Sequence, residues 1–184
     1  KQPDKLFVRR LLDVDTICRE WNDTLRMIKR RFPAFKVLLS VSPIRHLKDG
    51  LHGNQISKSV LLLAAERLCS ELDFCHYFPS YEIMMDELRD YRFYAEDMVH
   101  PSPLAVRYIW ERFCEAYMAE DTRKVMKQWE EIRRGLSHRP FDAKSDGYRR
   151  FLSQLVLKME ELKEKFPNFE VQKELEQCRT LLNT

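Results

Sequence analysis

The fold depends first on residues 35–43, which read FKVLLSVSP. This short apolar run contains β-branched residues and ends at a Ser-Pro pair, which predicts a buried parallel strand followed by a loop. A second such run, FCHYF at 74–78, is closed by Pro79-Ser80. Apolar residues at helical spacing predict helices over 14–32, 55–72 and 81–88, and another helix that opens at Ser102-Pro103. Residues 14–118 therefore alternate between helix and strand, which favours a parallel sheet covered by helices.

The remaining residues change in character. Charged amphipathic helices are predicted over 121–136 and 146–166, and a last helix over about 170–182. We therefore divide the chain into an α/β part, residues 1–118, and a helical extension, residues 119–184. Two strands do not make a stable open sheet. The α/β part is accordingly expected to be the C-terminal portion of a larger domain, with further strands supplied by an upstream segment or another chain.

Composition excludes several classes of protein. The chain has 184 residues, of which 44% are hydrophobic, so it is not intrinsically disordered. The 32 basic and 29 acidic residues nearly balance, and no large basic patch indicates a nucleic-acid partner. The longest apolar run, residues 60–65, is too short to cross a membrane. The five cysteines are odd in number and form no Cys-x-x-Cys pair, which favours a reducing, cytoplasmic setting.

Candidate chemistry lies after the predicted strands, where functional groups collect in open α/β sheets. One group is Ser42, Arg45 and His46, after the first strand. Because Ser42 stands before a proline and lacks a Gly-x-Ser-x-Gly elbow, we expect these three residues to bind substrate or to support the site. The alternative is that Ser42 only makes a turn. A further reading makes Ser42 or Ser80 the nucleophile, which we disfavour because neither has the elbow.

The second group is Asp97 and His100, in the loop before the helix that opens at Ser102. A carboxylate three residues before a histidine can accept the imidazole Nδ1–H and leave Nε2 free as a base. The non-catalytic alternative is an exposed aspartate beside a histidine that caps the next helix. The histidines and cysteines show no metal-ligand spacing, and no glycine-rich phosphate loop occurs, so neither a metal nor another cofactor is expected.

Several long motifs resemble the GSCFA family. They are SPIRHLKDG at 42–50, NQISK at 54–58, YFPSYEIMMDELRDYRFY at 77–94, DMVHPS at 97–102, IRR at 132–134 and HRPF at 138–141. This family is similar to the SGNH hydrolases of bacteria. The resemblance implies a flavodoxin-like three-layer α/β/α sandwich, of which only the C-terminal strands and helices are present, followed by the helical extension. It also implies that Asp97 and His100 are the acid and the base of a catalytic triad.

The chain departs from this family at one place. It contains no Gly-Ser-Cys-Phe-Ala motif, whose serine is the expected nucleophile, and no SGNH oxyanion-hole residues. The resemblance therefore implies a serine esterase whose nucleophile and oxyanion hole come from an upstream segment of the same protein, so that these residues alone are inactive. The expected substrate is a small ester, and family analogy points to an acyl group on a carbohydrate. The alternative is a non-catalytic binding or scaffolding module whose helical extension is a partner surface or a homo-oligomer contact.

Overall fold

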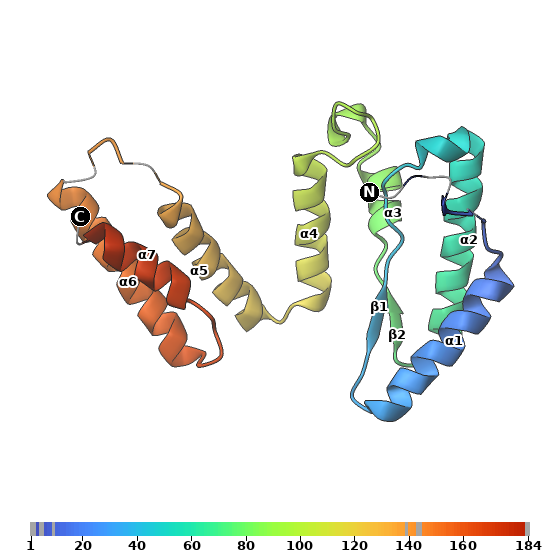
Figure 1. Ribbon diagram of the computed structural model, residues 1–184, viewed down its shortest axis with the longest axis horizontal. Helices are drawn as coiled ribbons and strands as arrows, with labels where there is room; N and C mark the ends of the chain where they lie inside the picture. Colours follow the sequence, from blue (N-terminus) through green and yellow to red (C-terminus); the bar gives the residue numbers. More distant parts are fainter. Residues whose placement is uncertain (1–2, 4–5, 9, 139, 143–144, 183–184) are drawn as a thin grey trace. The chain divides into compact units, whose positions relative to one another are not determined.

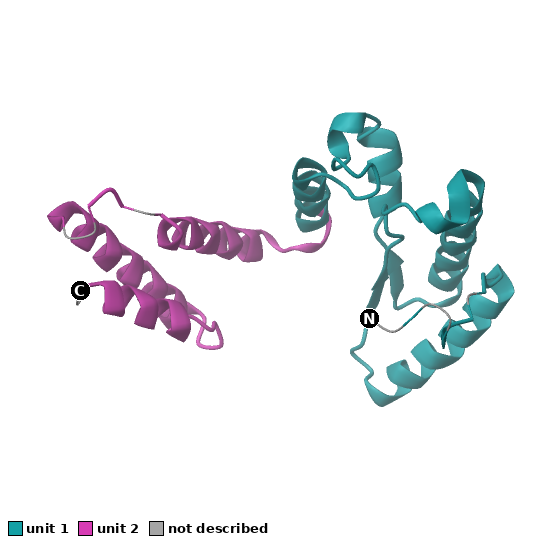
Figure 2. Cartoon of the chain, turned by 45° about the horizontal axis from the view of Figure 1, so that its top comes forward, with its two compact units in different colours: residues 1–115 teal, residues 116–184 magenta. Residues whose placement is uncertain are grey.

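The computed structural model describes residues 3, 6–8, 10–138, 140–142 and 145–182. The described chain divides into two compact units, Lys1–Glu115 and Ala116–Thr184 (Figure 2). Each unit has buried apolar clusters of its own. This division between residues 115 and 116 lies three residues before the boundary that the sequence predicted after residue 118. We describe each unit by itself.

Unit 1 follows the helix–strand alternation of its sequence (Figure 1). Its main elements are α1 (Val14–Arg31), β1 (Val37–Leu39), α2 (Gly50–Glu71), β2 (Cys75–Tyr77) and α4 (Pro103–Tyr117). Short turns lie between them: a 3₁₀ turn η2 (Leu47–Asp49), a helical turn α3 (Ser80–Glu82), a π-helical turn η3 (Ile83–Glu87) and a 3₁₀ turn η4 (Tyr91–Phe93).

The sheet consists of β1 and β2 paired in parallel, with Val37 opposite Cys75 and Leu39 opposite Tyr77. Side chains of α1 and α2 pack against one face of this pair, where Val37, Leu39 and Cys75 join an apolar cluster. Residues of the opposite face, Leu38 and His76, are exposed. Because side chains alternate between the faces of a strand, this pattern means that helices bury one face of the pair.

The prediction of a three-layer α/β/α sandwich is wrong. In the described residues the only strands are these two, each three residues long, and most of the chain is helical. The physical reason is that a parallel sandwich needs a wide sheet buried on both faces, whereas this pair has one covered face. The predicted buried strand 35–41 is correspondingly shorter and partly exposed.

Local capping explains where the helices begin. Asp13 accepts a hydrogen bond from the backbone N–H of Thr16 (2.7 Å) at the start of α1. Ser102 accepts one from Ala105 (3.3 Å) at the start of α4, as a serine before the first turn predicts. Helix α2 begins at Gly50, five residues before the predicted start at residue 55, and the carboxamide of Asn54 within it accepts the N–H of His46 (3.0 Å).

Unit 2 contains α5 (Glu120–Leu136), α6 (Asp146–Lys165) and α7 (Gln172–Leu182). Its buried cluster draws on all three helices and includes Ile132, Leu152, Met159 and Cys178. None of the helices in the described part of either unit is both long enough and apolar enough to cross a bilayer. The five cysteines are free thiols, and four of them are buried.

Candidate functional site

Asp97 and His100 contact each other directly. Their side chains lie 2.6 Å apart, from Asp97 Oδ2 to His100 Nδ1. The other carboxylate oxygen of Asp97 accepts the backbone N–H groups of Val99 (2.9 Å) and His100 (3.0 Å). With Nδ1 facing a carboxylate, the neutral imidazole carries its proton on Nδ1 and presents a bare Nε2. Among the described residues, none accepts from or donates to Nε2.

A narrow hairpin positions this pair. Tyr94 and Pro101 form an isolated antiparallel bridge, and Ala95 donates its N–H to the carbonyl of His100 (2.8 Å). At the tip, Met98 has a left-handed backbone (φ 57°), which a side chain with a Cβ adopts only at some cost. The hairpin therefore holds an unfavourable backbone conformation in which Asp97 folds back onto the residues that follow it.

Electrostatics keep the carboxylate of Asp97 ionised. The backbone N–H groups of His100 and Val99, and then the His100 side chain, lower the pKa of Asp97 from 3.8 to about 2. The cause is hydrogen bonding to the charged form, because the carboxylate itself is open to solvent. Both side chains are about half exposed, at 57% for His100 and 50% for Asp97. A protein or ligand group can therefore reach Nε2 from outside.

Arg45 joins the first predicted group of site residues to this hairpin. Its backbone N–H donates to the carbonyl of Val99 (3.2 Å), and its guanidinium Nη1 donates to the carbonyl of Met98 (3.2 Å). The guanidinium also lies 4.1 Å from the ring centre of Tyr94. The loop that contains Ser42, Arg45 and His46 is therefore bound to the loop that contains Asp97 and His100, although 52 residues separate Arg45 from Asp97.

Neither Ser42 nor Ser80 is placed as a nucleophile. Ser42 Oγ accepts the N–H of Ile44 (3.3 Å), a turn-forming bond. Ser80 Oγ donates to the carbonyl of Val41 (2.9 Å) and lies 2.6 Å from Ser40 Oγ. Among the described residues no serine hydroxyl is hydrogen-bonded to His100. The hydroxyl of Ser42 thus bonds within its own turn. Among the described residues, no serine contacts His100 as the nucleophile of a triad would.

Lys58 is the residue that sequence reasoning missed. Its side chain is 2% exposed, and its ammonium donates to the carbonyl of Ser42 (2.5 Å). Desolvation lowers the pKa of Lys58 below its ordinary value. No described carboxylate pairs with it. A lysine on a helix ordinarily indicates a solvated face, so the sequence pattern did not predict the burial of Lys58. The only sequence signal at this residue was its place in the NQISK motif.

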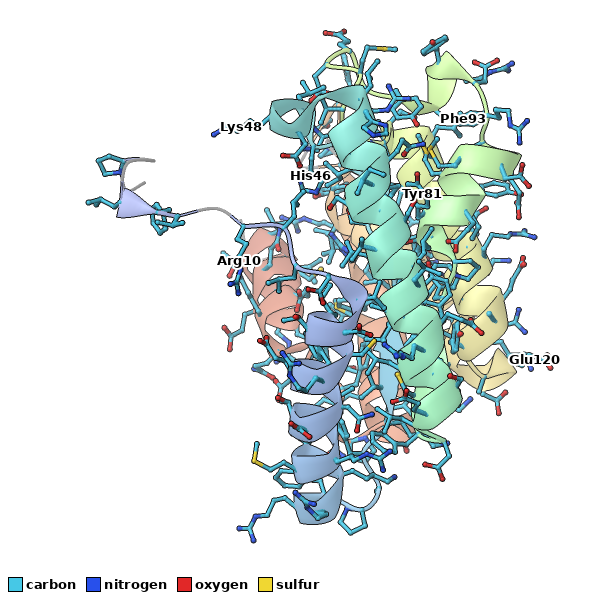
Figure 3. All side chains as sticks on the ribbon, turned by 90° about the vertical axis from the view of Figure 1, so that its right-hand side faces the viewer. Arg10, His46, Lys48, Tyr81, Phe93 and Glu120 are labelled. Carbon is cyan, nitrogen blue, oxygen red and sulfur yellow. The ribbon has the colours of Figure 1, made fainter. Side chains whose placement is uncertain are left out.

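A cavity of about 530 Å³ lies beside these loops. Arg45 and His46 line it from one loop, and Gln55 and Tyr81 line it from α2 and α3. Tyr81 donates its hydroxyl to the carboxamide oxygen of Gln55 (2.9 Å). Figure 3 shows His46 and Tyr81 beside the N-terminal half of α2. His100 does not line this cavity, and Arg45 is the link between the two.

Among the described residues, no group of three or more histidine, cysteine, aspartate or glutamate side chains is placed to hold a metal ion. The site consists of a carboxylate–imidazole pair, an arginine that links the hairpin to a neighbouring loop, and a cavity that the same arginine lines. This arrangement can hold an imidazole in one tautomer beside a binding pocket.

Two family models match the sequence. The GSCFA family matches residues 1–113, which lie within unit 1. The chain belongs to the GSCFA family. The model for the C-terminal domain of GSCFA domain proteins matches residues 129–184, which lie within unit 2. Comparison with curated proteins and with solved structures found no match. Family membership therefore rests on these two models, which together cover most of the chain.

Proposed function

We propose that this GSCFA family protein is a hydrolase of the SGNH type that cleaves small esters through a serine nucleophile. In this proposal Asp97 is the acid that orients the base, His100 is the base, and the serine and oxyanion hole come from a segment upstream of the 184 residues. The observation that carries it is the 2.6 Å contact between Asp97 Oδ2 and His100 Nδ1, in a pair of side chains that are about half exposed.

The chemistry follows from the proton positions. His100 Nε2 takes the proton of the serine hydroxyl as the serine oxygen bonds to the ester carbonyl carbon. The carbon–oxygen bond to the alcohol then breaks, and His100 returns the proton to the departing alcohol. Water repeats the two steps on the acyl-serine and releases the acid. Asp97 stays ionised throughout and stabilises the imidazolium, which its lowered pKa supports.

The test uses the full-length protein and a neutral ester such as p-nitrophenyl acetate. We expect His100→Gln to lower kcat/KM at least 100-fold with the circular dichroism spectrum unchanged, because the general base is lost. His76→Gln is the matched control, since His76 is exposed on β2 and makes no contact with the site. A fluorophosphonate probe should label one upstream serine in the control and not in His100→Gln.

Two results would overturn the proposal. One is retention of ester turnover by His100→Gln. The other is an absence of both turnover and labelling in the wild-type protein under conditions in which a known serine esterase reacts. The latter result would favour the alternative of a non-catalytic binding module.

A further inference from the structure

The cavity beside Arg45 is lined both by hydrogen-bond donors and by apolar groups. The donors are the side chains of Arg45 and Gln55, and the apolar groups include Leu47, Leu51 and Met85. None of its lining residues is an aspartate or a glutamate, within the part of the chain that the structure describes. A concave site of this size that combines apolar and polar side chains is typical of small-molecule binding.

Arg45 is a cation without a carboxylate partner. One N–H of its guanidinium donates to the carbonyl of Met98, and the guanidinium stacks on the ring of Tyr94. No described acidic residue forms an ion pair with it, unlike Arg92, which pairs with Asp90 nearby in the chain. A half-buried guanidinium with free N–H donors at a cavity wall matches the paired oxygens of a carboxylate or a phosphate.

Gln55 presents a second donor. Its carboxamide oxygen accepts from the hydroxyl of Tyr81 (2.9 Å) and from the carboxamide nitrogen of Asn54 (3.5 Å). These bonds orient the carboxamide so that its NH₂ group remains to donate, and no described residue accepts from it. The cavity therefore offers donors from two elements and calls for an acceptor as the ligand.

Two further positive charges lie around the cavity. Gly50 and Leu51 line it from the first turn of the 22-residue helix α2, where the helix dipole is positive. Lys58, buried on the same helix, has no described counter-ion and binds the loop between β1 and Arg45. Lys58 does not line the cavity, and the acidic Asp49 stands at the N-cap of α2, so these charges are secondary to the donors of Arg45 and Gln55.

From these observations we infer that the cavity binds an organic oxyanion, a carboxylate or phosphate held by Arg45 and Gln55 whose carbon chain packs against Leu47, Leu51 and Met85. We include a carbon chain in the ligand because an inorganic ion would make no apolar contact with Leu47, Leu51 and Met85. If the Asp97–His100 pair hydrolyses esters, which rests on the proposed function, the substrate is one that bears an anionic group.

The test measures binding without turnover, by ligand-observed NMR titration of the full-length protein at constant ionic strength. The probes are hexanoate, hexyl phosphate and hexan-1-ol, which share one carbon chain. We expect hexanoate or hexyl phosphate to bind at least tenfold more tightly than hexan-1-ol, and the tighter of the two identifies the preferred head group.

Two variants locate the contact. Arg45→Gln should remove the tenfold advantage of the anion, and Gln55→Glu, which replaces a donor by a negative charge, should do the same. Arg92→Gln is the matched control, because Arg92 is already paired with Asp90 (3.1 Å) and does not line the cavity. Arg45→Gln also loses its hydrogen bond to the hairpin. If that variant fails to fold, the binding measured with Gln55→Glu tests the inference.

The inference is overturned if hexan-1-ol binds as tightly as both anions, or if Gln55→Glu binds the anions as the wild type does. It is also overturned if Arg92→Gln weakens the anions as much as Arg45→Gln, because the attraction is then that of the general surface charge. These outcomes are independent of ester hydrolysis, so a failure here leaves the test of His100 unaffected.

Discussion

At the residue scale, the site depends on what Asp97 bonds to. One of its oxygens holds the imidazole of His100, and the other holds two backbone N–H groups of its own loop. The same carboxylate thus shapes the hairpin and orients the histidine. A substitution at Asp97 therefore changes both the loop and the imidazole, and the two effects separate by their dependence on pH.

The first prediction concerns the titration of Asp97. The carboxyl ¹³C signal should titrate with a midpoint about 2, as the hydrogen bonds from His100 and Val99 require. Since the folded pKa lies below the ordinary value of 3.8, the ionised carboxylate stabilises the fold above pH about 4. That stabilisation is lost as the pH falls from about 4 to about 2.

The difference in free energy of unfolding between the wild type and Asp97→Asn should follow the same course. It should shrink as the pH falls from about 4 toward about 2. The spectrum of Asp97→Asn serves to assign the signal. A midpoint near 4, or a stability difference that does not change with pH, would show that these hydrogen bonds do not form in solution.

At the element scale, the packing of unit 2 depends on a glycine in the last turn of α5. A Cβ added to Gly135 would lie 2.9 Å and 3.1 Å from the two methyl carbons of Leu155 and 3.2 Å from the ring of Phe151. Because Leu155 is 5% exposed and belongs to the buried cluster, it has little room to move. The absence of a side chain at Gly135 lets α5 approach α6 closely.

We expect Gly135→Ala to destabilise the protein by about 1 kcal/mol. Overpacking a core costs ~1–3 kcal/mol, and the better helix propensity of alanine, about 1 kcal/mol in a helix interior, offsets only part of it near a helix end. Gly147→Ala is the control, because Gly147 lies in the first turn of α6 with no heavy atom within 4 Å of an added Cβ. It should be neutral or stabilising by up to ~1 kcal/mol in urea unfolding. Equal effects of the two substitutions would contradict the steric argument.

At the scale of the whole molecule, the described chain consists of two units with separate cores. The cluster around Leu68 and Leu72 belongs to unit 1, and the cluster around Met159 and Leu152 belongs to unit 2. Each cluster draws only on helices and strands of its own unit. The stability of one unit should therefore respond to a cavity in its own core and not to one in the other.

Hydrogen exchange of the amide groups tests this expectation. Met159→Ala removes a fully buried side chain and should lower the protection of α5, α6 and α7 by an amount that corresponds to ~2–5 kcal/mol, with α1 and α2 unchanged. Leu68→Ala, which empties a 3% exposed position in unit 1, should do the reverse. Loss of protection in both units from either substitution would show that they unfold together.

Periodicity and turn chemistry in the sequence determined the elements themselves. Apolar spacing placed α1, α5, α6 and α7 within a few residues of their observed bounds, and Ser102-Pro103 marked the start of α4. These signals are local, because a helix face or a cap is a matter of neighbours three or four residues apart. The Asp97–His100 contact spans three residues, and for the same reason the spacing admitted it as one of two alternatives.

Tertiary structure alone decided the rest. The extent of β1 and β2 depends on what pairs with them. The alternation that predicted a helix-covered parallel sheet, and the resemblance that implied a sandwich, correspond in the structure to a two-stranded pair with one covered face. The burial of Lys58 and the bonds from Arg45 to the hairpin depend on residues 16 to 54 positions away. A sequence pattern indicates the periodicity of one segment but not the distance between two segments. For that reason the cavity beside Arg45 could be identified only from the folded structure.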